Sequence, residues 1–455
     1  MARIVDALAT TDAMSAIFGD APTVQVLLDV EAALARAQAS LGVIPASAAW
    51  AITQAAVADG FDADALAREA RPSATIVIPL VAALTARVEA VDPVAARYVH
   101  WGATSQDIVD TAVSVQIERA GHALERDHAT LAEQLRLLSD RHADTVMLGR
   151  TLLQPAPPTT FGLKAAGWYA SLCRSWARVA QAWHDAARVQ LGGASGTLAA
   201  FGDRGPKIAD ALGNDLGIRL PTAAAPWHTA RDRSAALVAA CAIYAGVLGK
   251  IARDVSLLMQ FEVGEAREAG GGSSAMPHKQ NPSGCARTLA AAARLPGLAA
   301  TMLAGLVQEH ERAVGAWQAE WPVIAEALQA TGAALEAMRD VIAGLSVDPA
   351  RMRANVDATR GAIFAERVVM LAAPVLGRSA AHQLLKDALA RSQASGQSLA
   401  DIVRAVPELA GVVDAEALRS LDDPRAYLGA AEALRQRLLA SIEDPLGRDV
   451  HAGGP

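Results

Sequence analysis

The sequence predicts an all-α protein in which several long helices form one bundle. Apolar residues recur at helical spacing over five long stretches, 105–140, 159–191, 231–269, 283–310 and 315–345. The stretch 231–269 contains no proline and is apolar on more than one face, so a helix there needs neighbours on all sides. We find no convincing run of alternating apolar and polar residues, which is the pattern that predicts strands.

The length of the chain predicts more than one domain. At 455 residues it exceeds the size at which a single core stops growing, and 52% of its residues are hydrophobic. Prolines and glycines divide both ends of the chain into shorter helical pieces. We therefore predict three helical domains: residues 1–104, a central long-helix bundle over 105–346, and residues 347–455. The apolar girth of 231–269 further predicts that the bundle is shared in an oligomer.

Composition and charge narrow the range of partners. The formal net charge of −7 argues against a nucleic-acid partner. The three cysteines, Cys173, Cys241 and Cys285, are far apart and indicate neither a disulfide framework nor a zinc site. The longest apolar run, 235–249, stops at Lys250 and is shorter than the roughly 20 residues of a membrane span. We expect a soluble cytoplasmic protein with no membrane partner, no metal and no cofactor.

One glycine-rich segment interrupts the helical pattern. It reads GGGSSAMPHKQNP and spans residues 270–282. Three glycines and two serines are typical of a flexible loop, whereas Pro277 and Pro282 fix the backbone around Lys279 and Asn281. A plain linker between two helices is the alternative interpretation, but a linker requires neither the lysine nor the asparagine.

Two further segments favour the binding of carboxylates. HWGATSQD (100–107) places Thr104 and Ser105 at a helix N-terminus, where hydroxyls, backbone donors and the helix dipole suit an anion. PWHTARDR (226–233) places Arg231 just before the longest helix, and a guanidinium binds a carboxylate through two parallel hydrogen bonds. The alternatives are a simple helix cap in the first segment and a solvated basic helix start in the second.

Together these segments resemble the fumarase/aspartase superfamily, whose signature is G-S-S-x-M-P-x-K-x-N-P. The resemblance implies a homotetramer with a shared central bundle, active sites assembled from loops of different subunits, and addition or elimination of a group β to a carboxylate. It also implies a small polycarboxylate substrate. It assigns proton transfer to Ser273, stabilisation of the alkoxide and the aci-carboxylate to Lys279, and a substrate hydrogen bond to Asn281. Its predicted substrate-binding residues are His100, Thr104, Ser105, Thr229, Arg231, Ser274, Met276 and Arg367.

The segment GRTLLQPAPPTTFGLK (149–164) favours one branch of this superfamily. It resembles the adenylosuccinate-lyase segment, but Leu152 replaces the histidine that is associated there with protonation of the leaving group. General acid catalysis typically contributes about 10²–10⁴-fold, and a carboxylate, with a pKa near ~4, leaves without it. The missing acid therefore favours lactonisation, in which the group added or expelled is a carboxylate.

Over essentially its whole length the chain resembles the branch that lactonises carboxylated muconates in aromatic catabolism. Two alternatives stay open. One is a lyase of the adenylosuccinate type, against which Leu152 argues. The other is a non-catalytic structural protein with the same fold, which would not need Ser273, Lys279 or Asn281. For Leu152 itself, the alternative is that it only fills space and that another histidine, His100 or His228, supplies the proton from a different direction.

Overall fold

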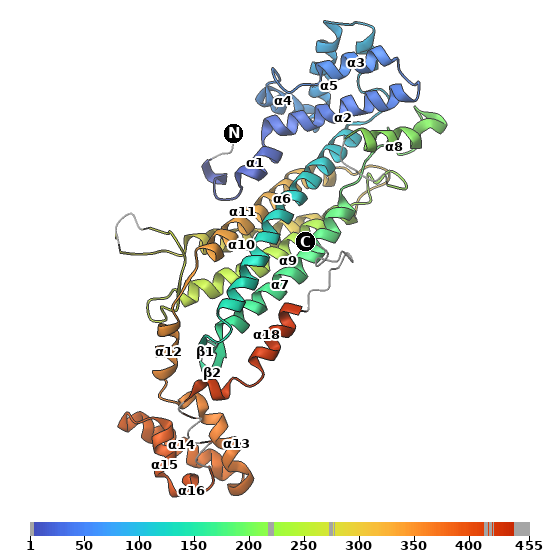
Figure 1. Ribbon diagram of the computed structural model, residues 1–455. Coiled ribbons are helices and arrows are strands. Elements are labelled where there is room, and N and C mark those ends of the chain that lie inside the picture. The colour runs from blue at the N-terminus through green and yellow to red at the C-terminus, as the bar shows by residue number, and fades with distance from the viewer. Residues whose placement is uncertain are drawn as a thin grey trace, which may run out of the picture. The chain divides into compact units, whose positions relative to one another are not determined.

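The computed structural model describes residues 4–216, 223–272, 276, 278–413, 417, 421 and 423–440, and most of these residues are helical (Figure 1). The predicted all-α class is confirmed. The helices are α1 (Asp12–Phe18), α2 (Asp20–Ser40), α3 (Ala46–Ala55), α4 (Ala63–Ala70), α5 (Val77–Glu89), α6 (Ser105–Arg141), α7 (Phe161–Ala186), α8 (Gly205–Asp215), α9 (Asp232–Leu258), α10 (Ser283–Ala304), α11 (Ala316–Ala343), α12 (Pro349–Asp357), α13 (Ala365–Leu376), α14 (Arg378–Ser395), α15 (Leu399–Ala405), α16 (Pro407–Ala410) and α18 (Ala431–Ala440). The strands are β1 (Val146–Thr151), β2 (Gln154–Thr160), β3 (Ala266–Arg267) and β4 (Ser346–Val347).

The chain divides into two compact units. The first contains residues 1–129, 175–250 and 286–339, and the second contains residues 130–174, 251–285 and 340–455. The division into three domains at 104/105 and 346/347 stays a prediction.

Parts of the five longest helices pack against one another within the first unit. The ring of His128 on α6 stacks on Trp176 of α7 at 4.6 Å and is hydrogen-bonded to the Tyr244 hydroxyl of α9 at 3.0 Å. Burial lowers the pKa of His128 to about 3, so this histidine is a neutral core residue. The hydroxyl of Thr288 on α10 donates to the carbonyl of Ala334 on α11. Within the first unit, buried contacts thus join α6, α7 and α9, and another joins α10 and α11.

Helix α9 is shorter than the sequence pattern suggests. It ends at Leu258 rather than at 269, because the chain turns at Gly264 with a positive φ of 63° and then forms β3. Its length and composition, with a mean hydropathy of 1.9, would allow it to cross a membrane, but 61% of its most apolar window is buried inside the protein. Burial of this kind is what a core helix requires. Helices α10 and α11 each contain a proline, Pro296 and Pro322 respectively, and continue past it.

Strands β1 and β2 form an antiparallel hairpin in the second unit that the sequence pattern did not predict. Its two-residue turn consists of Leu152 (φ 49°) and Leu153 (φ 66°), which is the type I′ geometry favoured in hairpins. The hairpin needs glycine at Gly149, because a Cβ there would lie 2.3 Å from the carbonyl oxygen of Pro157. Leu152 and Leu153 are 97% and 73% exposed in the single chain.

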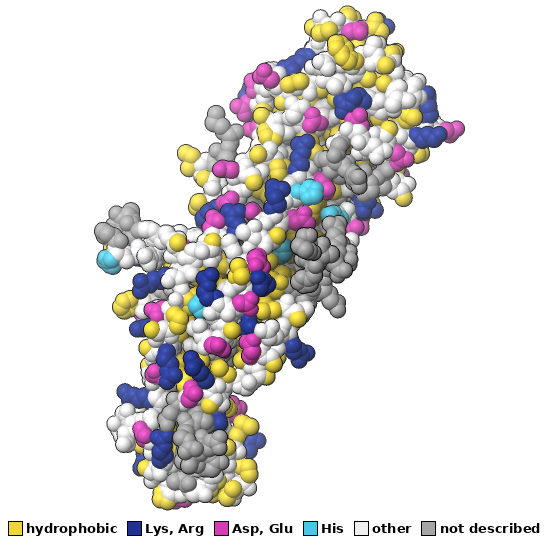
Figure 2. Space-filling model, in the orientation of Figure 1, with side chains coloured by type: hydrophobic (Ala, Val, Ile, Leu, Met, Phe, Trp, Pro, Cys, Tyr) yellow, Lys and Arg dark blue, Asp and Glu magenta, His cyan; other side chains and the backbone are white. Residues whose placement is uncertain are grey.

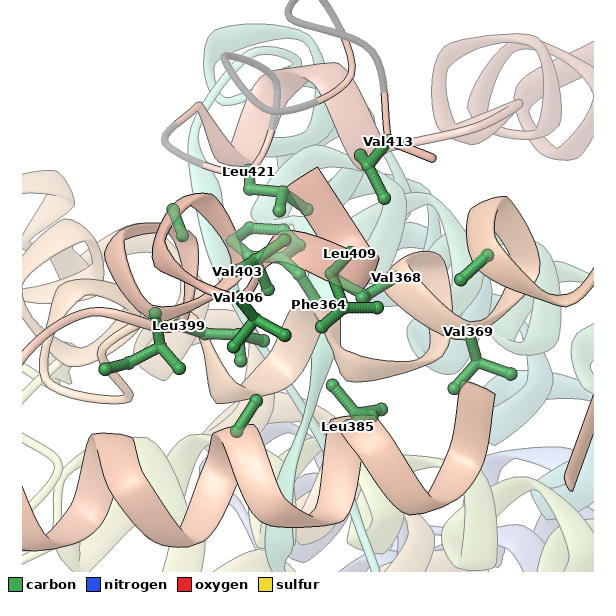
Figure 3. Close-up of a cluster of buried hydrophobic side chains, with 14 of the residues drawn as sticks. Phe364, Val368, Val369, Leu385, Leu399, Val403, Val406, Leu409, Val413 and Leu421 are labelled. Atoms are coloured by element: carbon green, nitrogen blue, oxygen red, sulfur yellow. The ribbon is translucent and has the colours of Figure 1, made fainter. Parts of the chain in front are cut away.

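The C-terminal helices have their own hydrophobic cluster in the second unit. Figure 3 shows Phe364, Val368, Leu385, Val403 and Leu409 pointing toward one another from helices α13 to α16 and the turn before α13. Burial of such side chains contributes about 1.5–3 kcal/mol each, which is enough to stabilise this group of short helices.

Acidic and basic side chains are interspersed on the face of the molecule drawn in Figure 2. No extended surface of a single sign is visible there, in keeping with the mildly acidic net charge of −7.

Candidate active site

Asp107 organises the N-terminus of helix α6 in the first unit. Its carboxylate is 1% exposed and accepts the backbone N–H of Thr104 at 3.0 Å, which is one half of a capping box. It also accepts the N–H groups of Gly192 and Gly193, each at 2.9 Å. The Nε2–H of His228 donates to the same carboxylate at 2.8 Å. One buried carboxylate thus joins two of the sequence motifs and the turn at Gly192.

Arg312 contacts the Thr104 hydroxyl, and the sequence motifs gave no sign of it. Its Nη1 donates to Thr104 Oγ1 at 2.6 Å, and its Nη2 donates to the carbonyls of Gly193 and Ala194, each at 3.1 Å. All of these acceptors are neutral, and Arg312 Nε is buried with no hydrogen-bond partner in the part of the chain that the structure describes. A guanidinium in this setting keeps its positive charge available for an anion near Thr104.

His100 pairs with a buried glutamate that the motifs also missed. Its Nδ1–H donates to Oε1 of Glu31 at 2.6 Å, and the Glu31 side chain is 1% exposed. Burial disfavours the imidazolium, but the charge of Glu31 and its hydrogen bond outweigh this effect and raise the pKa of His100. His100 is therefore a better proton donor or anion contact near neutral pH than a free histidine.

Arg231 lies inside a buried ion network. Its Nη1 and Nη2 donate to Asp110 at 2.8 and 3.1 Å, and its Nε donates to Glu320 at 2.8 Å. Burial disfavours its charged form, yet the two carboxylates outweigh that cost and raise the pKa of Arg231. The guanidinium is 3% exposed and also lies over the Trp227 ring at 4.6 Å. In the single chain the side chain is thus engaged in structure, and substrate binding by Arg231 stays a prediction.

Thr229 and Ser105 complete the predicted residues of the first unit. The hydroxyl of Thr229 donates to the carbonyl of His310 at 3.2 Å, two residues before Arg312. Ser105 is the first residue of α6 and is half-buried. Five predicted residues, His100, Thr104, Ser105, Thr229 and Arg231, therefore lie in one unit.

A cavity of about 540 Å³ lies in the same unit and is mainly apolar. Trp317 lines it and also donates its Nε1–H to Asp110 at 3.0 Å, which links the cavity wall to the ion network of Arg231. Arg71 and Thr75, in the segment before α5, lie among its lining residues. The volume is in the range of small-molecule sites.

The signature loop belongs to the second unit. The predicted residues Ser273 and Ser274 lie outside the described residues. Met276 is 42% exposed and Lys279 is exposed. Asn281 is fixed by two hydrogen bonds: its N–H donates to the Gly271 carbonyl at 2.6 Å, and its Nδ2 donates to the Gly272 carbonyl at 3.3 Å.

The predicted residue Arg367 also lies in the second unit, on α13. Its Nη1 donates to the carbonyl of Ala426 at 2.8 Å, and its guanidinium lies 5.1 Å from the centre of the Tyr427 ring. These contacts give Arg367 a structural role in the C-terminal part of the chain. Its assignment to substrate binding stays a prediction.

The described residues contain no group of three or more histidine, cysteine, aspartate or glutamate side chains placed to hold a metal ion. The polar side chains described above are hydroxyls, amides, histidines, carboxylates, a lysine and arginines. Hydroxyls, amides and guanidinium groups bind carboxylates through hydrogen bonds.

Comparison with known proteins identifies the family. A family model described as "Lyase" matches residues 7–297, and one described as "Adenylosuccinate lyase C-terminus" matches residues 361–438. The first match spans more than half of the 455 residues. The chain therefore belongs to this lyase family, the fumarase/aspartase superfamily, as its motifs predicted.

Individual relatives agree with this class. The chain is 47% identical to the 3-carboxy-cis,cis-muconate cycloisomerase of Bradyrhizobium diazoefficiens, over 95% of this chain and 96% of that protein. It is 43% identical to the nitrosuccinate lyase of Streptomyces davaonensis, over 93% of this chain and 91% of that protein. The crystal structure of the 3-carboxy-cis,cis-muconate lactonizing enzyme from Pseudomonas putida matches with a TM-score of 0.90 at 41% identity, covering 96% and 98% of the two chains. The predicted enzyme class, a cycloisomerase of this superfamily, is confirmed.

Proposed function

We propose that the protein is a 3-carboxy-cis,cis-muconate cycloisomerase acting in the cytoplasm, in the protocatechuate branch of the β-ketoadipate pathway of aromatic catabolism. The observation that supports this most is Leu152, an apolar residue at the position of a general acid, in a chain 47% identical to such a cycloisomerase. A reaction whose leaving group is a carboxylate needs no acid there. The test is whether the wild-type protein consumes 3-carboxy-cis,cis-muconate, the conjugated diene acid that is the proposed substrate.

The proposed reaction joins a carboxylate to a double bond of the same molecule. A carboxylate oxygen forms a C–O bond, and the electron pair moves to the carbon next to another carboxylate, giving an aci-carboxylate. Ser273 then transfers its proton to that carbon, and in the reverse direction its alkoxide removes the proton. Lys279 stabilises the serine alkoxide and the aci-carboxylate, and Asn281 donates a hydrogen bond to the substrate. The fixed backbone at Asn281 supports this role.

We assign a second carboxylate of the substrate to the N-terminus of α6. Thr104, Ser105 and the positive end of the helix dipole suit an anion, and Arg312 supplies a guanidinium beside the Thr104 hydroxyl. His100, with its raised pKa, adds a further donor. A tricarboxylate substrate can use several such contacts at once.

The replacement Arg312→Gln should raise KM about 10–100-fold and change kcat far less. A hydrogen bond to a charged group contributes about 1.5–3 kcal/mol, and each 1.4 kcal/mol is a factor of ten. Steady-state kinetics on the diene acid measures this. The control is Arg188→Gln, since Arg188 faces Asp185 at 3.7 Å and is partly exposed. A KM within twofold of the wild-type value for Arg312→Gln would contradict the assignment.

We further propose a homotetramer in which each active site takes residues from different subunits. The exposed leucines at the hairpin tip support it, because Leu152 and Leu153 place two large apolar side chains in water. Each also adopts a left-handed backbone conformation that costs roughly 1–2 kcal/mol in a residue other than glycine. Contact of this tip with a second copy of the chain would offset both costs.

The replacement Leu152→His should slow lactonisation several-fold and confer no cleavage of adenylosuccinate. The imidazole needs a polar partner in what we propose is an apolar contact, and a carboxylate leaving group gains nothing from an acid. Folding should not suffer, because histidine tolerates the left-handed conformation better than leucine does. Leu152→Met, which stays apolar, serves as the control. Faster lactonisation by Leu152→His would show that an acid was missing from the site.

Nitrosuccinate is a second candidate substrate. The 43% identity to a nitrosuccinate lyase favours it, and so does Leu152, since a nitro group departs as the stable nitrite anion without a proton. Both candidates share the proton step next to a carboxylate and differ in the group that leaves. Parallel assays with the two acids separate them.

A further inference from the structure

Helix α10 begins directly after a proline. It starts at Ser283, and the residue before it, Pro282, has no side-chain acceptor for the first backbone N–H groups. Glu268 supplies an acceptor for two of these groups from the other end of the signature loop. Its Oε1 accepts the N–H of Gly284 at 2.8 Å, and its Oε2 accepts the N–H of Cys285 at 3.3 Å.

The Glu268 carboxylate that makes these contacts is buried. The Glu268 side chain is 4% exposed, and Cys285 is fully buried beside it. Burial, together with the charge and hydrogen bonding of Glu268, raises the pKa of the Cys285 thiol to about 12, so the thiol stays protonated and can donate to the carboxylate. A negative charge at a helix N-terminus is further favoured by the helix dipole.

A second contact, between Gly271 and Asn281, joins the two sides of the loop. The N–H of Asn281 donates to the Gly271 carbonyl at 2.6 Å, and a Cβ on Gly271 would lie only 1.8 Å from the Asn281 carbonyl oxygen. The segment that enters the loop at Gly271 therefore lies directly against the segment that leaves it at Asn281. Glu268 and Gly271 thus both contact the outgoing segment, residues 278–285, which carries Lys279 and Asn281.

We propose that Glu268 is a positioning residue, which ties the two ends of the signature loop together and so holds Lys279 and Asn281 in their working geometry. The carboxylate touches no substrate and acts through the backbone of Gly284 and Cys285. This inference rests on the proposed function for its kinetic consequence. Its structural consequence, an ordered outgoing segment, can be measured independently.

The replacement Glu268→Gln tests the proposal, because it keeps the size of the side chain. The amide presents an NH₂ group to one of the two backbone N–H donors, so one hydrogen bond and the charge are lost. We expect kcat to fall about 10–100-fold with KM within about threefold, since a displacement near 1 Å can cost that much. Amide exchange over residues 278–285 should accelerate at least about tenfold.

Two further variants make the result decisive. Glu268→Asp keeps the charge on a shorter side chain and should recover part of the lost turnover. Glu262→Gln removes an exposed carboxylate six residues earlier and should behave as wild type. Turnover of Glu268→Gln within twofold of wild type, or unchanged exchange over 278–285, overturns the proposal. So does a loss of turnover that equals the loss of folded protein. If the wild type lactonises no muconate, the proposed function fails, and amide exchange still decides the role of Glu268.

Discussion

Replacing Ser273 with alanine should lower turnover of the diene acid by at least about 10³-fold. In the proposed mechanism the Ser273 hydroxyl is the group that protonates carbon, and no other side chain takes that role. The free energy of unfolding should stay within about 1 kcal/mol of the wild-type value, because a loop hydroxyl contributes little to packing. The measurements are single-turnover kinetics and urea denaturation of both proteins.

Ser274→Ala is the matched comparison, since it removes a hydroxyl from the neighbouring position. We assign Ser274 to substrate binding, so its loss should act mainly on KM. Near-normal turnover by Ser273→Ala would exclude this serine as the proton-transfer group. Equal losses of kcat in the two variants would point to disruption of the loop rather than to chemistry.

Replacing Arg231 with methionine should destabilise the protein by about 3–5 kcal/mol. Asp110 and Glu320 are both buried, and the arginine is the cation that they share. Removal of one partner leaves buried carboxylates without compensation, which costs more than the ion pair contributes. Burial is the largest cause that raises the pKa of Glu320, so this carboxyl is the one expected to take up a proton in the variant.

Arg136→Met is the control for this effect. Arg136 forms ion pairs with Glu133 and Asp140 on the exposed surface of α6, and pairs of this kind contribute about 0–1 kcal/mol. Urea denaturation of the three proteins gives the free energies of unfolding. A loss below about 1 kcal/mol for Arg231→Met would mean that the network is not structural, and would favour a role in substrate binding.

The long helices were predictable because apolar residues recur along their sequences with the period of an α-helix. The stretch 105–140 became α6, Ser105–Arg141, almost residue for residue, since apolar side chains recur along it and Thr104 and Asp107 mark its start. The end of α9 was not predictable in this way. Apolar residues continue past Leu258, so the periodicity does not mark the point where the helix ends before the turn at Gly264.

The hairpin β1–β2 escaped prediction because its sequence contradicts the usual signals. Three prolines, Pro155, Pro157 and Pro158, fall in β2, and proline is normally excluded from all but edge strands. The turn is Leu152-Leu153 instead of the Asn-Gly or Asp-Gly pair that a type I′ turn favours. A function at the tip would explain why leucine is found where folding alone favours glycine.

The candidate site was predicted only where it lies in compact motifs. Thr104 and His228 share the carboxylate of Asp107, and all three lie in the two segments singled out from the sequence. Arg312 and Glu31 contact the same motifs from 208 and 69 positions away along the chain, respectively. Such long-range contacts leave no periodic or motif signal in a single sequence, so they can be identified only in the three-dimensional structure.

The most direct test of the account is an assay of the wild-type protein on three acids in parallel: 3-carboxy-cis,cis-muconate, nitrosuccinate and adenylosuccinate. Ultraviolet absorbance follows the loss of the conjugated diene in the first, and product analysis identifies the lactone. We predict that the diene is consumed with kcat/KM of at least about 10⁴ M⁻¹ s⁻¹, the lower end of the usual range for enzymes, and that adenylosuccinate stays intact. An unchanged diene together with rapid cleavage of adenylosuccinate or nitrosuccinate would contradict the central claim, that this site joins and releases a carboxylate within one molecule.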